Sequence, residues 1–185
     1  MTPDGVSPLL QALYEGRRED ALMLRDSGGP LDVFEAAALA ETRRVAELLG
    51  ADPSLAEARS PDGFTALHLA AFLGDEETVG ELLQRGADAE AIAHNPMEVR
   101  PLHSAAAARA LPSVVVLLDH GADPDARQQR GITALHAAAL HGDSEMVAAL
   151  MDAGANPLLA DEDGSMPAAY ARRGGHDDLA RELGG

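Results

Sequence analysis

One nine-residue segment recurs along this chain of 185 residues at an almost constant spacing. It is GITALHAAA at residues 131–139 and GFTALHLAA at residues 63–71. A shortened copy, RPLHSAA, occupies residues 100–106, and a degenerate copy, GSMPAA, occupies residues 164–169. The steps between equivalent positions are 35, 33 and 33 residues, counted between Leu67, Leu102, Leu135 and Ala168. A fixed period of this length indicates a repeat array, in which no unit buries its own apolar face and stability comes from stacked neighbours.

Each repeat has the pattern of two short helices joined by a tight turn. Thr65 and Thr133 lie where a first helix would begin, because a threonine hydroxyl there can accept a hydrogen bond from a free backbone amide. His68 and His136 follow three residues later, within reach of the same turn. Small alanines come next, and they let neighbouring helices approach closely. A second helix with larger apolar residues at helical spacing follows. The glycines suited to end these second helices in a left-handed conformation are Gly86, Gly121 and Gly154.

The pattern resembles the ankyrin repeat, which has a period of about 33 residues and a Thr-Pro-Leu-His-x-Ala signature. A second signature, Gly-Ala-Asp or Gly-Ala-Asn, follows in register at residues 86–88, 121–123 and 154–156, with an earlier copy at residues 50–52. Two signatures that keep register with each other are hard to produce by chance. The resemblance implies an all-α fold, an ankyrin-repeat solenoid of stacked helix-turn-helix units joined by hairpin-like loops.

The whole chain, residues 1–185, is predicted to form a single ankyrin-repeat domain. The first unit lacks the signature but keeps two short apolar segments around Gly16, and the last unit is strongly polar. Both are features of capping units, which turn one face to water. The predicted units are an N-terminal capping unit at 1–30, repeats at 31–59, 60–92, 93–127 and 128–160, and a C-terminal capping unit at 161–185.

The third repeat differs from the others at its entrance. Its step is two residues longer, and Glu98 and Arg100 stand where its neighbours have glycine and threonine. An insertion in a repeat usually lies in a loop on one face, often the binding face. Residues 94–99 are therefore a candidate binding feature. The alternative is drift in a tolerant surface loop, and the sequence favours neither interpretation.

Charge restricts the classes of partner. The chain carries 31 acidic and 14 basic side chains, a formal net charge of −17 at pH 7, and every basic residue is an arginine. This balance argues against nucleic acid, whose binding rests on cationic contacts to phosphates, and against anionic membranes. A solvated acidic surface serves solubility or attracts a basic partner. The complete absence of lysine suggests a GC-rich, bacterial genome.

Cysteine is absent, so the chain has no disulfide framework and no thiol chemistry. The sequence does not begin with the charged and then apolar pattern of a signal peptide, and it has no apolar run near the ~18 residues of a membrane span. We therefore expect a soluble, cytoplasmic monomer.

No set of residues in the sequence has the pattern of a catalytic or metal site. The resemblance gives His68, His103 and His136 a turn-fixing role. The segment at 161–164 begins like a calcium loop, but Arg172 occupies the twelfth position, where such a loop needs a glutamate. Phosphate-binding loops and nucleophile elbows are absent as well. We therefore predict that the chain is not an enzyme and that it has no cofactor and no metal site.

The resemblance implies that turn tips and inner helices line a concave groove that holds a partner. The positions that correspond are Pro61, Asp62, Phe64, Phe72 and Leu73 in the second repeat; Asn95, Met97, Val99 and Ala107 in the third; and Gln129, Arg130, Ile132, Leu140 and His141 in the fourth. Several of them are large and apolar, and contiguous exposed apolar surface marks an interaction site. Packing between units is the alternative role for Phe72 and Leu73.

These observations predict a non-catalytic protein–protein interaction module, a scaffold that presents a rigid concave groove to a partner protein of unknown identity. Rigidity favours binding because little ordering entropy is lost on association. Two alternatives remain open from the sequence. One is a small-molecule or metal site that uses His141 and nearby acidic groups, and the other is a self-assembling structural protein.

Overall fold

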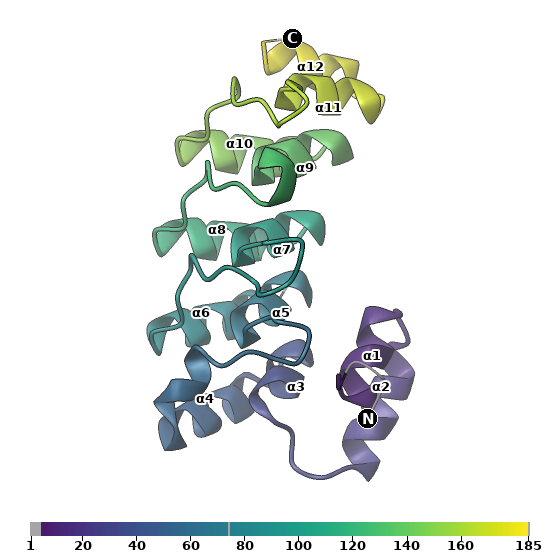
Figure 1. Ribbon diagram of the computed structural model, residues 1–185, viewed down its shortest axis with the longest axis vertical. Helices are drawn as coiled ribbons and strands as arrows, with labels where there is room; N and C mark the ends of the chain where they lie inside the picture. The colour runs from purple at the N-terminus through teal and green to yellow at the C-terminus, as the bar shows by residue number, and fades with distance from the viewer. Residues whose placement is uncertain (1–4, 74, 185) are drawn as a thin grey trace.

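The computed structural model describes residues 5–73 and 75–184. These residues form a stack of helix pairs, with α3, α5, α7, α9 and α11 in one column and α4, α6, α8 and α10 in a second (Figure 1). No strand occurs in these two segments, and the predicted all-α solenoid of stacked helix-turn-helix units is confirmed. The predicted terminal units extend beyond the described residues at their outer ends, where residues 1–4 and Gly185 lie.

The described α helices are α1 (Pro8–Tyr14), α2 (Arg18–Ser27), α3 (Val33–Ala38), α4 (Thr42–Ala51), α5 (Ala66–Leu73), α6 (Glu76–Gln84), α7 (Pro101–Ala107), α8 (Leu111–Asp119), α9 (Ala134–His141), α10 (Ser144–Asp152), α11 (Pro167–Arg173) and α12 (Asp177–Glu182). Two short 3-10 turns, Pro53–Ala56 and Gln129–Gly131, lie in the connections. None of these helices has the length and apolarity that a membrane crossing requires.

Small side chains set the spacing of the inner column, α3 to α11. Alanines such as Ala70, Ala105 and Ala138 are completely buried between successive helices. The signature leucines Leu67 and Leu135 are buried beside them, at most 1% exposed. One continuous apolar core runs through the stack from the third helix to the last. Each unit therefore depends on its neighbours for burial, as a repeat array requires.

Signature histidines join α5, α7 and α9 to the connections that lead toward the next inner helix. The Nδ1 atom of His68 accepts a hydrogen bond from the backbone amide of Thr65 at 3.3 Å, so the proton is on Nε2, which donates to the carbonyl of Val99 at 3.0 Å. His103 does the same between Arg100 and Ala126. The third signature histidine, in α9, repeats the arrangement. The predicted turn-fixing role is confirmed, and burial lowers the pKa of both His68 and His103 to about 4.

The first helix pair lies beside the inner column and not on the axis of the stack (Figure 1). Apolar residues of α1 and α2 form a second buried cluster with Ala38 and Leu39 at the end of α3 and with Leu69 of α5. An ion pair of 3.1 Å between Arg25 and Glu41 adds to this contact. The pair therefore covers the inner-helix side of the first two repeats and forms a wall beside the third.

Candidate functional site

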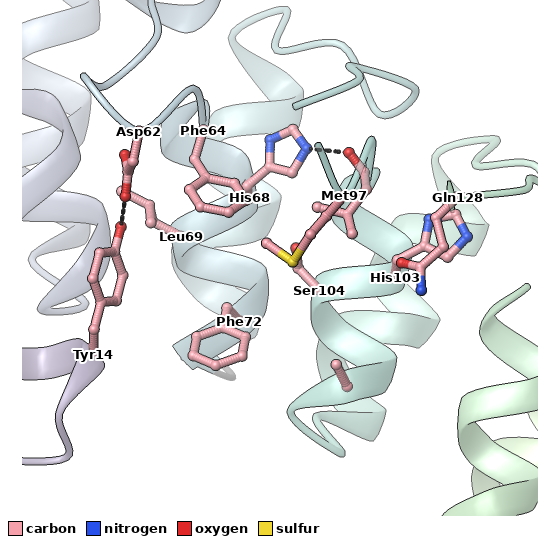
Figure 2. Close-up of a pocket in the computed structure, with 12 residues that line it drawn as sticks. Tyr14, Asp62, Phe64, His68, Leu69, Phe72, Met97, His103, Ser104 and Gln128 are labelled. Carbon is pink, nitrogen blue, oxygen red and sulfur yellow. Dashed lines mark hydrogen bonds between the residues drawn. The ribbon is translucent and has the colours of Figure 1, made fainter. Parts of the chain in front are cut away.

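A pocket of about 490 Å³ opens on the inner-helix side of the array. Its walls come from the C-terminal end of α1, the turn tip before α5, α5 itself, the loop at 94–99 and α7 (Figure 2). The wall from α1 exists because the first helix pair folds against α3 and α5. The pocket thus combines the end of the first helix pair with parts of the second and third repeats.

Six residues of the predicted groove come together in this pocket. Two of them are large apolar residues with a high exposed fraction, 44% for Phe72 and 50% for Met97. The predicted groove residues that line the pocket are Asp62, Phe64, Phe72, Met97 and Val99, together with Ala107. Their part in binding is a prediction that rests on this placement.

The other predicted residues lie outside the pocket. Leu73 packs against the N-terminal apolar cluster, and Arg130 forms an ion pair with Asp163 of the next turn. Leu140 and His141 are exposed at the end of α9, in the repeat after α7, and do not line the pocket. The predicted residues that do not line it are Pro61, Leu73, Asn95, Gln129, Arg130, Ile132, Leu140 and His141.

The longer loop of the third repeat is held against the turn before it. The backbone amide of His94 donates to the carbonyl of Gly63 at 2.9 Å, and the Nδ2 atom of Asn95 donates to the carbonyl of Asp62 at 3.2 Å. Gly63 has a φ of +88°, and a Cβ added to it would lie 2.5 Å from the carbonyl oxygen of His94. Only glycine fits this contact without a shift of the loop.

The same loop is joined to the turn after it, and these bonds place Met97. The Oδ1 atom of Asn95 accepts from the backbone amide of Met97 at 3.1 Å, and the carbonyl of Met97 accepts from the amide of Gln129 at 3.1 Å. Met97 is thereby held at the pocket wall. The predicted feature at 94–99 is thus an anchored part of the pocket, and its role in binding stays a prediction.

Tyr14 is a pocket residue that the sequence did not suggest. Its hydroxyl donates to Oδ2 of Asp62 at 2.8 Å (Figure 2). Burial first, and then the bond to Asp62 and its negative charge, raise the pKa of Tyr14, so the hydroxyl stays protonated. The available signal was compositional, since Tyr14 is an aromatic residue in a chain that is only 3% aromatic. The remaining lining residues outside the predicted set are His68, Leu69, His103, Ser104 and Gln128.

The chemistry of the pocket is apolar with one carboxylate. His68 and His103 line it, but both nitrogens of each ring are engaged in hydrogen bonds, and the lowered pKa keeps the rings neutral at pH 7. Asp62 is the single charged residue among the lining side chains. In residues 5–73 and 75–184, no group of three or more His, Cys, Asp or Glu side chains is arranged to hold a metal ion. The site can therefore bind an apolar group with a cationic end.

Comparison with protein families gives one match that covers most of the chain. A family model described as ankyrin repeats, in three copies, matches residues 33–128 and again residues 102–184. The matched ranges include α3 to α12, and the first helix pair lies outside them.

Several curated proteins are similar in sequence. Tyrosine-protein kinase Shark of Drosophila melanogaster is 33% identical over 136 residues, which cover 73% of this chain and 14% of the kinase. The B-cell lymphoma 3 protein homolog of Mus musculus is 41% identical over 86 residues, 46% of this chain and 19% of that protein. Cyclin-dependent kinase 4 inhibitor B of Rattus norvegicus is 36% identical over 121 residues, 63% of this chain and 88% of the inhibitor.

The chain thus spans less than a fifth of the first two relatives and most of the third. All three come from animals, so they lend no support to the bacterial origin that the composition suggested.

Proposed function

Because this chain belongs to the ankyrin-repeat family, we propose that it is a non-catalytic protein–protein interaction module, with its binding surface at the pocket between α1, α5 and α7. The observation that carries the proposal is the exposure of Phe72 and Met97 around one apolar hollow. Large apolar side chains in contact with water on a hollowed surface are typical of an interaction site. The partner is another protein, and the chain acts as a soluble cytoplasmic monomer.

Rigidity of the array supports this function. Arg59 donates from Nη1 to the carbonyl of Ile92 in the next repeat at 2.7 Å. Arg127 makes the equivalent bond to the carbonyl of Ala160 at 3.1 Å. Together with the histidine bonds and the anchored loop, these contacts keep the turn tips in fixed positions before a partner arrives. A preformed surface loses little conformational entropy on binding.

The proposal includes no catalytic role because the polar side chains of the pocket already form hydrogen bonds with other groups of the protein. His68 and His103 bond to the backbone of neighbouring turns, and the hydroxyls beside Asp62, those of Tyr14 and Ser60, have no histidine base within hydrogen-bonding contact because both histidines are engaged elsewhere. A catalytic site needs a nucleophile, a base and a group that orients them. The name of the rat relative, an inhibitor of a cyclin-dependent kinase, fits a protein that acts by binding another protein.

The test is affinity capture from a cell lysate with the wild type and with Phe72→Ala/Met97→Ala. Both side chains are exposed, so the double variant should fold like the wild type, which circular dichroism checks. We expect a protein that the wild type retains and the variant loses. The matched control is Val115→Ala/Met151→Ala, two exposed apolar residues on the outer helices, which should retain it.

Equal retention by both double variants would show that the pocket is the wrong face of the array. Capture of nothing by the wild type would contradict the interaction function, and light scattering over a range of concentrations would then test self-assembly, the structural alternative.

A further inference from the structure

Aromatic side chains are concentrated at the pocket. The chain contains only two tyrosines and three phenylalanines. Three of these five, Tyr14, Phe64 and Phe72, line the pocket (Figure 2). Aromatic faces carry partial negative charge and attract a cation placed over them, most strongly where water is excluded. This wall therefore suits both an apolar stem and a positive charge.

Asp62 adds a carboxylate to the same wall without a cation to neutralise it. Its Oδ2 atom accepts from the Tyr14 hydroxyl at 2.8 Å and its Oδ1 atom accepts from the Ser60 hydroxyl at 2.5 Å. Each carboxylate oxygen can accept a further hydrogen bond. In the described part of the chain, no arginine forms an ion pair with Asp62.

The equivalent aspartate at the other end of the array is neutralised. Asp163 precedes a turn glycine just as Asp62 does, and it pairs with Arg130 of the preceding tip. The guanidinium of Arg59 donates to the carbonyl of Ile92, and that of Arg100 donates to the carbonyl of Arg127 and pairs with Glu90, so neither neutralises Asp62. The pocket wall thus keeps an uncompensated negative charge on a molecule of net charge −17.

We propose that the pocket binds a lysine or arginine side chain on a peptide segment of the partner protein. Its aliphatic stem packs among the rings of Tyr14, Phe64 and Phe72, and its charge meets the carboxylate of Asp62. The inference rests on the proposed function and names the chemistry of the partner at that site. Charge complementarity between the cation and the unpaired carboxylate sets specificity and speeds association.

The shape of the pocket favours a peptide as the source of the cation. The aromatic wall continues into an apolar one made by Met97, Val99 and Ala107 on the next repeat. A peptide that places its basic side chain at Asp62 can lay an adjacent apolar side chain on this second wall. The expected recognition pattern is therefore a basic residue close to a large apolar residue.

The experiment is selection of a phage-displayed library of random twelve-residue peptides on the full chain, followed by fluorescence polarisation with the most enriched peptide. We expect the enriched peptides to share a lysine or arginine next to a large apolar residue. Asp62→Asn should weaken binding about tenfold, because it removes a charge-assisted hydrogen bond that contributes about that factor to the affinity. Phe72→Leu, which keeps apolar bulk but removes the aromatic face, should weaken it about threefold.

The matched control is Asp163→Asn, the same substitution at the equivalent turn position, which should leave the affinity for the peptide unchanged. Circular dichroism confirms that each variant folds. Replacement of the basic residue of the peptide by glutamine should abolish the difference between the wild type and Asp62→Asn.

Three results would overturn the inference. They are enriched peptides without a basic residue, equal binding by Asp62→Asn and the wild type, and tetramethylammonium binding as tightly as the peptide, which would assign the site to a free cation. A library that enriches nothing while the wild type still captures a protein from lysate would also overturn it, and the interaction function would stand. Failure of both experiments would reject the proposed function itself.

Discussion

The turn before α5 and the turn before α11 occupy equivalent positions in the repeat, yet they use the same residue differently. Asp62 and Asp163 both precede a glycine with positive φ. Asp163 pairs with Arg130 on the neighbouring tip, whereas Asp62 bonds to Tyr14 of the first helix pair and faces an apolar pocket. The comparison shows that the repeat sets where a side chain stands, and that its neighbours set what the side chain can do.

A second equivalent pair teaches the same point. Phe72 is the last residue but one of α5, and Leu140 has the same position in α9. Both are exposed, but only Phe72 lines the pocket, because α1 and the longer loop at 94–99 build walls around it. The predicted groove residues of the fourth repeat do not line the pocket.

The largest expected effect comes from truncating an equivalent buried leucine in the second and in the fourth repeat, which should lower stability in both but weaken binding in only one. Leu67→Ala and Leu135→Ala remove equivalent, fully buried side chains, and each should lower the free energy of unfolding by about 2–5 kcal/mol. Urea unfolding measures both losses. Leu67 lies in α5 under the pocket, so only its variant should also weaken partner capture. Equal loss of capture by both variants would mean that binding depends on the whole array.

Acid should destabilise the array through the histidines of the pocket region. The folded pKa of His68 and of His103 is about 4, below the unfolded value of about 6.5. Between these values the unfolded chain binds protons that the folded chain does not, so stability is lost as pH falls from about 6.5 to 4, by about 1.4 kcal/mol per pKa unit for each histidine.

Urea unfolding at pH 7 and pH 5 measures that loss, and NMR titration of the imidazoles assigns it. His68 and His103 should remain neutral at pH 5 in the folded chain. Protonation of either ring near pH 6.5 without unfolding would contradict the prediction.

Alanine substitutions at the two turn glycines probe the anchored loop directly. Gly63 and Gly164 have φ of +88° and +78°, so an alanine at either costs about 1 kcal/mol of backbone strain. At Gly63 the added Cβ also meets the carbonyl of His94, whereas at Gly164 nothing lies within 4 Å. Gly63→Ala should therefore cost about 2 kcal/mol more, because overpacking adds to strain.

Thermal unfolding of the two alanine variants gives the difference. Gly63→Ala should also displace the loop that carries Met97 and weaken partner capture, while Gly164→Ala should not. Equal stability of the two would show that the loop at 94–99 moves freely away from the turn.

The smallest expected effect is a gain in stability at the turn before α7. Glu98 has a φ of +51° at the position where the neighbouring repeats have Gly63 and Gly131. Glu98→Gly should raise the free energy of unfolding by up to about 1 kcal/mol, since glycine adopts this conformation without strain. Differential scanning calorimetry measures the gain. Destabilisation by this substitution would indicate that the glutamate side chain contributes a contact that outweighs the strain.

Much of the candidate site could be predicted because the repeat period places it. Counting from Leu67 puts Asp62 and Phe64 on a turn tip and Phe72 at the end of an inner helix, and all three line the pocket. The two-residue insertion likewise marked the loop that carries Met97. Tyr14 could not be placed this way, because the first helix pair lacks the signature and no periodic position applies to it.

The helices, their pairing and the contacts between successive repeats are determined by the sequence alone, because they depend on local signals repeated at a fixed spacing. Caps, small alanines and glycines act within one unit or between neighbours. The position of α1 and α2 was decided only by tertiary structure. Their apolar residues could be buried at the end of the stack or against the inner helices, and contact with Leu39 and Leu69 selects the second. This position brings Tyr14 to Asp62 and completes the pocket. The sequence does not specify it, because the hydrophobic effect is non-directional and would favour burial of these residues at either place.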